Sequence, residues 1–259
     1  SFGGLWNPGG ALPVSELSPE SWTWPATLRR AGYRTGLLGV WGASRRHGAA
    51  AFGYEEEVPE AEYRKFMDAA YPNVKYTNGF FGEPNPVPVE DAPSRWFAEK
   101  ACDMMRRFHA GGEPWHIALH FHDPHLPCRP AGRFATMYDP ASIPPWPSFG
   151  DTFEGKPYIQ KQQLLSWGIE HFTWEDWAPI VARYYGAVSE MDEAVGRVLS
   201  ELDALGAAED TIVIFTADHG DMCGAHRMMD KHYILYDDVL RVPMFVRWPG
   251  VVPEGAVCE

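Results

Sequence analysis

The alternation of short apolar runs with helical patterns is the feature that most constrains how this chain folds. Four runs alternate little between polar and apolar side chains; they lie at residues 34–42, 115–122, 211–217 and 242–249. This pattern suits strands that are covered on both faces, as in parallel sheets under helices. Because helical patterns lie between the runs, an α/β fold is favoured. We therefore predict a mostly parallel, mixed sheet sandwiched between helices.

Three segments carry the signals of helices. The first has a cap signal at Ser18 and stops at Gly32, and the second runs from about Ser94 to His109. The longest spans about residues 177–205, where apolar residues recur every three or four positions and form one apolar face. We expect this long helix to feed directly into the third apolar run.

Residues 130–175 have no sustained period and are rich in Pro, Trp and Phe. Because each Pro fixes φ and removes a backbone donor, we predict an irregular excursion over the surface of the domain. Such an excursion either shapes a substrate entrance or only packs on the domain. The aromatic side chains of this region either line a mouth for a sugar or aryl group or pack the segment, and we favour packing. They are Trp146, Phe149, Phe153, Trp167, Phe172, Trp174 and Trp177.

Composition excludes some classes of protein. The formal net charge of −13, from 22 Lys and Arg against 35 Asp and Glu, argues against a nucleic-acid partner. No run reaches the ~18 apolar residues that a membrane helix needs, and no basic-then-apolar leader precedes the first helix. Since the chain does not begin with Met, we expect a fragment, and its compartment stays open, with a secretory leader among the possibilities. The four cysteines have no paired short spacing, which predicts reduced thiols.

An acidic residue and a histidine follow the third apolar run directly. Asp218 and His219 come at the carboxyl end of the predicted strand 211–217, where open α/β sheets bind their ligands. A carboxylate and a neutral imidazole are both good ligands for a divalent cation, although an Asp that caps the next turn explains the pair about as well. Gly220 permits a sharp bend behind them. Lys231, thirteen residues beyond Asp218, either holds a tetrahedral anion or is an ordinary surface lysine.

Three histidines cluster at the end of the second apolar run. They are His120, His122 and His125, and Pro124 and Pro127 fix the loop around His125. Imidazole is the usual proton donor or acceptor for a leaving oxygen, whereas three histidines together also suit zinc. Because His120 and His122 alternate with core residues, we expect at least one of them to be structural.

Taken together, these segments resemble the sulfatases of the alkaline-phosphatase-like superfamily. The stretch "TIVIFTADHGDMCGAHRMMDKHYILYDDVLRVPMFVRWPG" (211–250) looks like their second signature region, and "HFHDPHLP" (120–127) resembles their Pro-His-x-Pro loop. "PATLRRAGYRTGLLGVWG" (25–42) is similar to their first helix–strand unit, and "SEMDEAVGRVL" (189–199) matches the helix before the metal strand. The matches keep the family's order over most of residues 20–250.

The resemblance implies one sulfatase-like catalytic domain over residues 1–259, truncated at both ends, with an alkaline-phosphatase-like fold. Asp218 and His219 fall on the family's ligands for one divalent metal ion, commonly Ca²⁺ in sulfatases and Mn²⁺ or a similar ion in phosphonate-hydrolysing relatives. His125 falls on the histidine that contacts the leaving oxygen, and Lys231 falls on the lysine that binds the sulfuryl oxygens. A metal ion and two cationic groups would neutralise charge on an anionic ester as its bond to the leaving oxygen breaks.

The chain departs from the family pattern in two places. It has no Cys- or Ser-x-Pro-x-Arg segment, in which Cys or Ser becomes the formylglycine nucleophile, and no early Asp-Asp pair. Because "SFGGLWNPGG" resembles the stretch after the nucleophile helix, we expect both features upstream of Ser1. In addition, Val40, Trp41 and Gly42 stand where typical sulfatases have Lys-Trp-His. This change removes up to two positive contacts, each worth about 1.5–3 kcal/mol as a charged hydrogen bond.

The leading hypothesis is a fragment of a hydrolase that cleaves a small-molecule or saccharide sulfate ester, with a nucleophile made by a formylglycine-generating enzyme in the full-length protein. The fragment alone is expected to be inactive. Val40 and Gly42 favour the alternative of a phosphodiester or phosphonate monoester hydrolase, which also lacks the Lys/His pair. A non-catalytic sulfatase-like binding protein is the third hypothesis. Arg45, Arg46 and His47 in the next loop either compensate for the lost cations or are ordinary surface charges.

Overall fold

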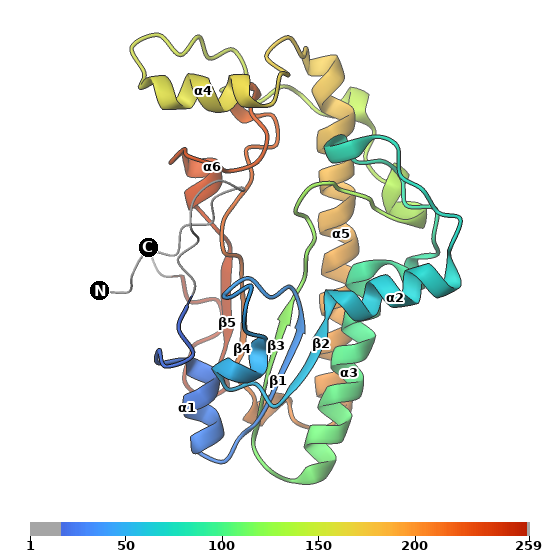
Figure 1. The fold of residues 1–259 in the computed structure, drawn as a ribbon, viewed down its shortest axis with the longest axis vertical. Coiled ribbons are helices and arrows are strands. Elements are labelled where there is room, and N and C mark those ends of the chain that lie inside the picture. Colours follow the sequence, from blue (N-terminus) through green and yellow to red (C-terminus); the bar gives the residue numbers. More distant parts are fainter. Residues whose placement is uncertain (1–16, 258–259) are drawn as a thin grey trace. The chain divides into compact units, whose positions relative to one another are not determined.

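A computed structural model describes residues 17–257 (Figure 1). The chain divides into two compact units. The described part of the first unit comprises residues 17–73, 93–122 and 194–201, and that of the second comprises residues 74–92, 123–193 and 202–257. The prediction of a single catalytic domain over residues 1–259 stays a prediction.

The first unit contains a three-stranded parallel sheet with the order β2-β1-β3. The strands are β1 (Arg34–Gly39), β2 (Glu56–Pro59) and β3 (Trp115–His120). In β1, every residue after Arg34 is buried, as predicted for a strand covered on both faces. Strand β2 was not predicted, because its four residues include two glutamates and a proline and carry little strand signal.

Helix α3 (Pro93–Gly111) packs on this sheet and forms the core of the first unit. Phe97, Met104 and Phe108 pack with Leu38 of β1 in one apolar cluster. Gly36 of β1 permits this close approach, because a Cβ there would lie 2.1 Å from the sulfur of Met104. The unit also contains α1 (Trp24–Arg30) and α2 (Glu60–Ala70).

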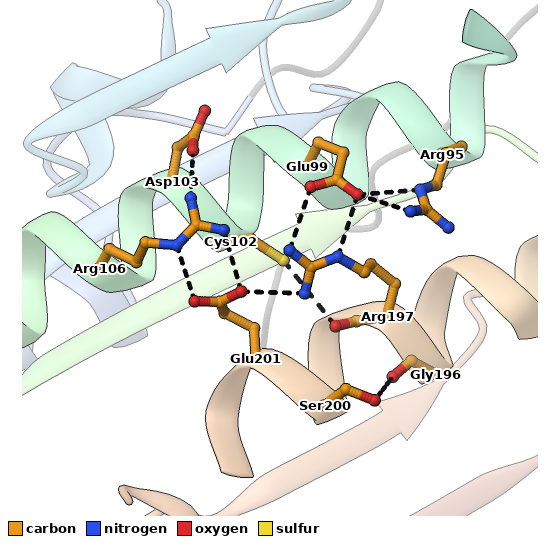
Figure 2. A network of polar contacts seen from close by, with 9 residues as sticks. All are labelled: Arg95, Glu99, Cys102, Asp103, Arg106, Gly196, Arg197, Ser200 and Glu201. Carbon is orange, nitrogen blue, oxygen red and sulfur yellow. Dashed lines mark hydrogen bonds and ion pairs between the residues drawn. The ribbon is translucent and has the colours of Figure 1, made fainter. Parts of the chain in front are cut away.

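Ion pairs join α3 to residues 194–201 of helix α5 (Trp174–Ala204) in the first unit (Figure 2). Arg197 donates to Glu99 at 3.0 Å and pairs with Glu201 at 2.9 Å, and Arg106 donates to Glu201 at 2.7 Å. The two arginines therefore share Glu201, whose side chain is only 11% exposed. Arg95 and Asp103 extend the network at its two ends.

The second unit contains the rest of α5 and the two strands nearest the chain's carboxyl end. Strands β4 (Val213–Thr216) and β5 (Met244–Arg247) pair antiparallel with each other. The mixed α/β character predicted from the sequence is confirmed, but the prediction that all four apolar runs are covered on both faces is wrong for this pair. All four residues of β5 are exposed, and Phe245 keeps 68% of its surface accessible.

Aromatic packing dominates the irregular region before α5. Trp177 is completely buried, and the rings of Phe149 and Trp174 meet edge to face with centroids 5.1 Å apart. The indole N–H groups of Trp146 and Trp174 donate to the backbone carbonyls of Cys223 and Ile143. These rings are thus used for packing, the interpretation favoured above.

Several boundaries differ from the sequence prediction. Helix α1 begins after Thr23 rather than near Ser18, because Pro25 sits in its first turn, and Ser18 instead accepts a bond from Glu20 in a turn of its own. The region 130–175 contains a helix, α4 (Tyr158–Ser166), which follows Pro157 and has too weak an apolar face to be recognised from periodicity.

The remaining helical elements are short. They are α6 (Asp237–Leu240) and the 3₁₀ turns Ala49–Phe52, Gly79–Phe81, Val89–Asp91, Gly132–Thr136, Pro140–Ser142, Ala208–Asp210 and Ala225–Arg227. Among residues 17–257, none of the helices combines the length and apolar character needed to cross a bilayer.

Candidate functional site

All four residues singled out from the sequence lie in the second unit. Asp218 and His219 follow β4, Lys231 lies in the loop before α6, and His125 lies in the loop after β3. The structure brings His125 and Lys231 into direct contact and sets the His125 ring near the His219 ring, with centroids 6.2 Å apart. Segments about a hundred residues apart in the chain therefore meet at one place.

Lys231 directly follows a compact hairpin-like turn over residues 221–230, here called the 221–230 loop. Its two arms are joined by backbone hydrogen bonds from Met222 to Asp230 (3.0 Å) and from Gly224 to Met228 (2.9 Å). The Asp221 carboxylate closes the base, because it accepts from the backbone N–H groups of Cys223 and Asp230. Burial, together with the nearby charge of Asp230, raises the pKa of Asp221.

Lys231 is not a surface lysine. Its side chain is 19% exposed, and its ammonium lies 2.9 Å from Asp230 and 2.5 Å from Nε2 of His125. His125 Nδ1 faces the carbonyl of Leu126 at 2.8 Å, so the tautomer that satisfies both contacts carries its proton on Nδ1. Nε2 then accepts from Lys231, and the pair presents a shared positive charge.

Asp218 and His219 are adjacent residues whose side chains carry donor atoms of the kind that bind a divalent cation. His219 Nδ1 lies 2.9 Å from the carbonyl of Gly220, to which it donates, and this leaves the Nε2 lone pair free. Metal-binding histidines are commonly oriented by such a bond from the second ring nitrogen. Nε2 lies 3.5 Å from Asp218 Oδ2, and the Asp218 side chain is 88% exposed. This donor set fits a divalent cation as two ligands of a larger set.

Gly220 has a different role from the sharp bend expected. A Cβ at this position would lie 1.9 Å from the carbonyl oxygen of Asp238, and the Gly220 N–H donates to Val239 at 2.8 Å. The glycine thus permits close packing of the turn that carries Asp218 and His219 against the backbone of α6 and its neighbours.

The three-histidine zinc alternative gains no support. In the part of the chain that the structure describes, no three His, Cys, Asp or Glu side chains converge in a way that suits a metal ion. His120, at the exposed end of β3, has its Nδ1 3.0 Å from the Val40 carbonyl, and the expectation that one of the three is structural stays a prediction.

The cationic loop after β1 lies in the first unit. Ser44 accepts from the backbone of Arg46 and His47, and the side chains of Arg45, Arg46 and His47 are exposed. Their suggested role as substitutes for the missing Lys/His pair stays a prediction.

Two carboxylates beside the candidate site residues were not predicted from the sequence. Asp221 shapes the base of the 221–230 loop, and Asp230, whose side chain is 5% exposed, pairs with both Lys231 and His232 at 2.9 Å. Their only signal in the sequence is that each carboxylate adjoins a residue already singled out, in "HGD" and "DK".

Comparisons with known proteins place the chain in a family. A family model described as Sulfatase matches residues 11–257. The ulvan-active sulfatase of Formosa agariphila is 25% identical over 260 residues, which cover 95% of this chain and 43% of that protein. The chain thus spans less than half the length of that relative.

Solved structures share the fold. The phosphonate monoester hydrolase SpPMH from Silicibacter pomeroyi aligns with a TM-score of 0.73 at 23% identity, over 91% of this chain and 54% of its own. A protein solved in complex with its substrate D-glucosamine-2-N,6-O-disulfate aligns with a TM-score of 0.66 at 17% identity, over 91% of this chain and 57% of its own.

Proposed function

This chain belongs to the sulfatase family, and we propose that it is part of a metal-dependent hydrolase that cleaves a sulfate monoester of a saccharide. The observation that carries the proposal is the contact between Lys231 and His125, with the His219 ring and its neighbour Asp218 beside it. The saccharide is suggested by the glucosamine disulfate bound to the related fold.

The four residues divide three tasks between them in the proposed reaction. The Lys231 ammonium binds the sulfuryl oxygens and neutralises part of their charge. His125 lies against that ammonium, where its imidazole is placed to assist the leaving oxygen as proton donor. Asp218 and His219 would hold one divalent ion, Ca²⁺ on the family pattern, which when bound adds Lewis-acid stabilisation of the ester oxygens.

The nucleophile is expected from a Cys- or Ser-x-Pro-x-Arg segment, which the 259 residues of this chain do not contain. In the full-length protein, a formylglycine-generating enzyme would convert that Cys or Ser to the reactive residue. The upstream coding sequence tests this directly. Absence of such a segment from an intact gene would favour the non-catalytic binding protein instead.

Cleavage of a phosphonate monoester or phosphodiester is the second candidate function. Val40 and Gly42 replace the two cations that typical sulfatases supply, and the phosphonate monoester hydrolase shares the fold over 91% of this chain. For this function, Mn²⁺ or a similar ion would take the place of Ca²⁺.

One preparation of the full-length protein decides between the two candidates. Turnover of matched aryl sulfate, aryl phosphonate and phosphodiester substrates is measured before and after chelation, and with Asp218→Ala. We expect sulfate to be preferred and both treatments to abolish turnover. A preference for the phosphonate would select the second candidate, and turnover that survives both treatments would refute the metal-dependent mechanism.

A further inference from the structure

The tip of the 221–230 loop is held by a polar cluster that the proposed reaction does not use. Asp151, in the irregular segment before α4, accepts a hydrogen bond at 2.6 Å from His226 Nδ1 and a second from Lys156. The Asp151 carbonyl also accepts from Arg227 at 3.0 Å. One residue therefore binds two consecutive residues at the tip of the loop. We name Asp151, Lys156, His226 and Tyr236 the Asp151 clasp.

Tyr236 closes the clasp from the other side. Its ring stacks on the His226 ring with centroids 4.0 Å apart, and its hydroxyl lies 3.2 Å from the Lys156 ammonium. The hydroxyl also donates to Gln160 of α4 at 2.8 Å. The His226 and Asp151 side chains are only 14% and 12% exposed, so solvent competes weakly for these bonds.

The backbone that the clasp holds, at the tip of the 221–230 loop, has a conformation that its residues rarely adopt. His226 and Arg227 have φ values of 52° and 59°, in the left-handed region that non-glycine residues rarely adopt. Cys223, Asp230 and Tyr233 share this feature, so five such residues fall within eleven positions around Lys231. A conformation of this kind persists only where surrounding contacts over-determine it.

The ionised state of Asp151 suits its role in holding the tip of the loop. Burial opposes its ionisation, but the hydrogen bonds from Lys156, the backbone of Phe153 and His226 outweigh burial and lower the pKa of Asp151 to about 2. The carboxylate is thus ionised at any pH at which the protein would work, and its bonds to the loop tip are charge-assisted.

We propose that Asp151 is a positioning residue for Lys231: by holding the tip of the 221–230 loop, it fixes the Lys231 ammonium against His125. The path between them is short. The tip at residues 225–227 leads through the Gly224–Met228 and Met222–Asp230 backbone bonds to Asp230, which pairs with Lys231. The inference rests on the proposed function only for the nature of the anion that Lys231 binds.

The test compares Asp151→Asn with Asp139→Asn in the protein that contains the whole chain. Asp139 lies in the same irregular region, and among the described residues its side chain accepts from Ala141 in its own turn, so it is a matched control. The affinity for inorganic sulfate is measured by calorimetry. We expect Asp151→Asn to weaken binding about tenfold, Asp151→Glu to restore most of the loss, and Asp139→Asn to bind as wild type.

A double-mutant cycle shows whether Asp151 acts through Lys231. In a Lys231→Met background, Asp151→Asn should change sulfate affinity no further, because the group that it positions is gone. Equal losses in both backgrounds would overturn the proposal. Lys156→Met leaves the Asp151–His226 bond in place, so it serves as a second variant if Asp151→Asn misfolds. We expect it to weaken sulfate binding by a smaller factor than Asp151→Asn.

Amide hydrogen exchange tests whether Asp151 holds the loop independently of the proposed function. Asp151→Asn should speed exchange of the Met222 and Gly224 amides, while the α3 amides exchange as in wild type. If the wild-type protein bound no sulfate, the proposed function would fail, yet faster exchange would still support the clasp. Wild-type exchange of these two amides in Asp151→Asn would overturn the clasp whatever the ligand.

Discussion

The carboxylate of Glu190 on α5 accepts a hydrogen bond of 2.9 Å from the backbone N–H of Ala131, in the loop that carries His125. Glu190 is 5% exposed, and among the described residues its second oxygen, Oε1, has no hydrogen-bond partner. Burial, with added repulsion from Asp123 and Glu193, raises the pKa of Glu190 to about 7 despite this bond. The buried carboxylate of Glu190 therefore links α5 to the loop that carries His125.

The stability of the protein should depend on pH through Glu190. Because the folded state binds its proton more tightly than the unfolded state, the stabilisation is complete below about pH 4.5 and is lost as pH rises through about 7. The loss amounts to at most about 3 kcal/mol. Glu190→Gln should remove this dependence, so the free energy of unfolding of the variant relative to wild type should rise between pH 4.5 and 8. Urea unfolding at a series of pH values measures it, and parallel profiles would contradict the assignment.

Lys231→Met should weaken binding of sulfate, or raise KM for a sulfate ester, about 10- to 100-fold, the worth of one charged hydrogen bond. The physical reason is the loss of the ammonium that lies against His125. Lys161→Met, at an exposed position of α4, is the matched control and should behave as wild type. Equal affinities for sulfate in the two variants would remove Lys231 from the anion site.

Gly220→Ala should destabilise the turn that carries Asp218 and His219. The new Cβ would lie 1.9 Å from the Asp238 oxygen, which is backbone and cannot move aside cheaply. We expect a loss of about 1–3 kcal/mol in unfolding free energy. Gly196→Ala, in an open position of α5, has nothing within 4 Å of the new Cβ and should be neutral or stabilising. Thermal unfolding compares the two variants, and a neutral Gly220→Ala would show that the turn is looser than described.

Phe108→Ala should lower the unfolding free energy by about 3–5 kcal/mol, as for large-to-small changes in a core. Phe108 is completely buried between α3 and β1, where it packs with Leu38 and Met104. The neighbouring exposed His109 provides the control, since His109→Ala removes no core contact. Denaturant unfolding measures both, and a loss below about 1 kcal/mol for Phe108→Ala would contradict this packing.

Local signals in the sequence were sufficient for much of the fold. Apolar runs placed β1, β3, β4 and β5, and three- and four-residue periodicity placed α5. These elements are long or apolar enough for their own residues to specify them. Strand β2 and helix α4 carry weak sequence patterns and were not predicted. The position of β2 depends on its pairing with β1, and the start of α4 depends on the proline before it.

For the candidate site, the sequence by itself determined the residue types and their order: a carboxylate–imidazole pair after a strand, a lysine beyond it and a histidine on a separate loop. Only the tertiary structure decided that Lys231 touches His125, that Asp221 and Asp230 shape the loop, and that Asp151 holds its tip. The physical reason is distance along the chain. His125 and Lys231 are 106 residues apart, and residues so far apart meet only after many separate elements have packed.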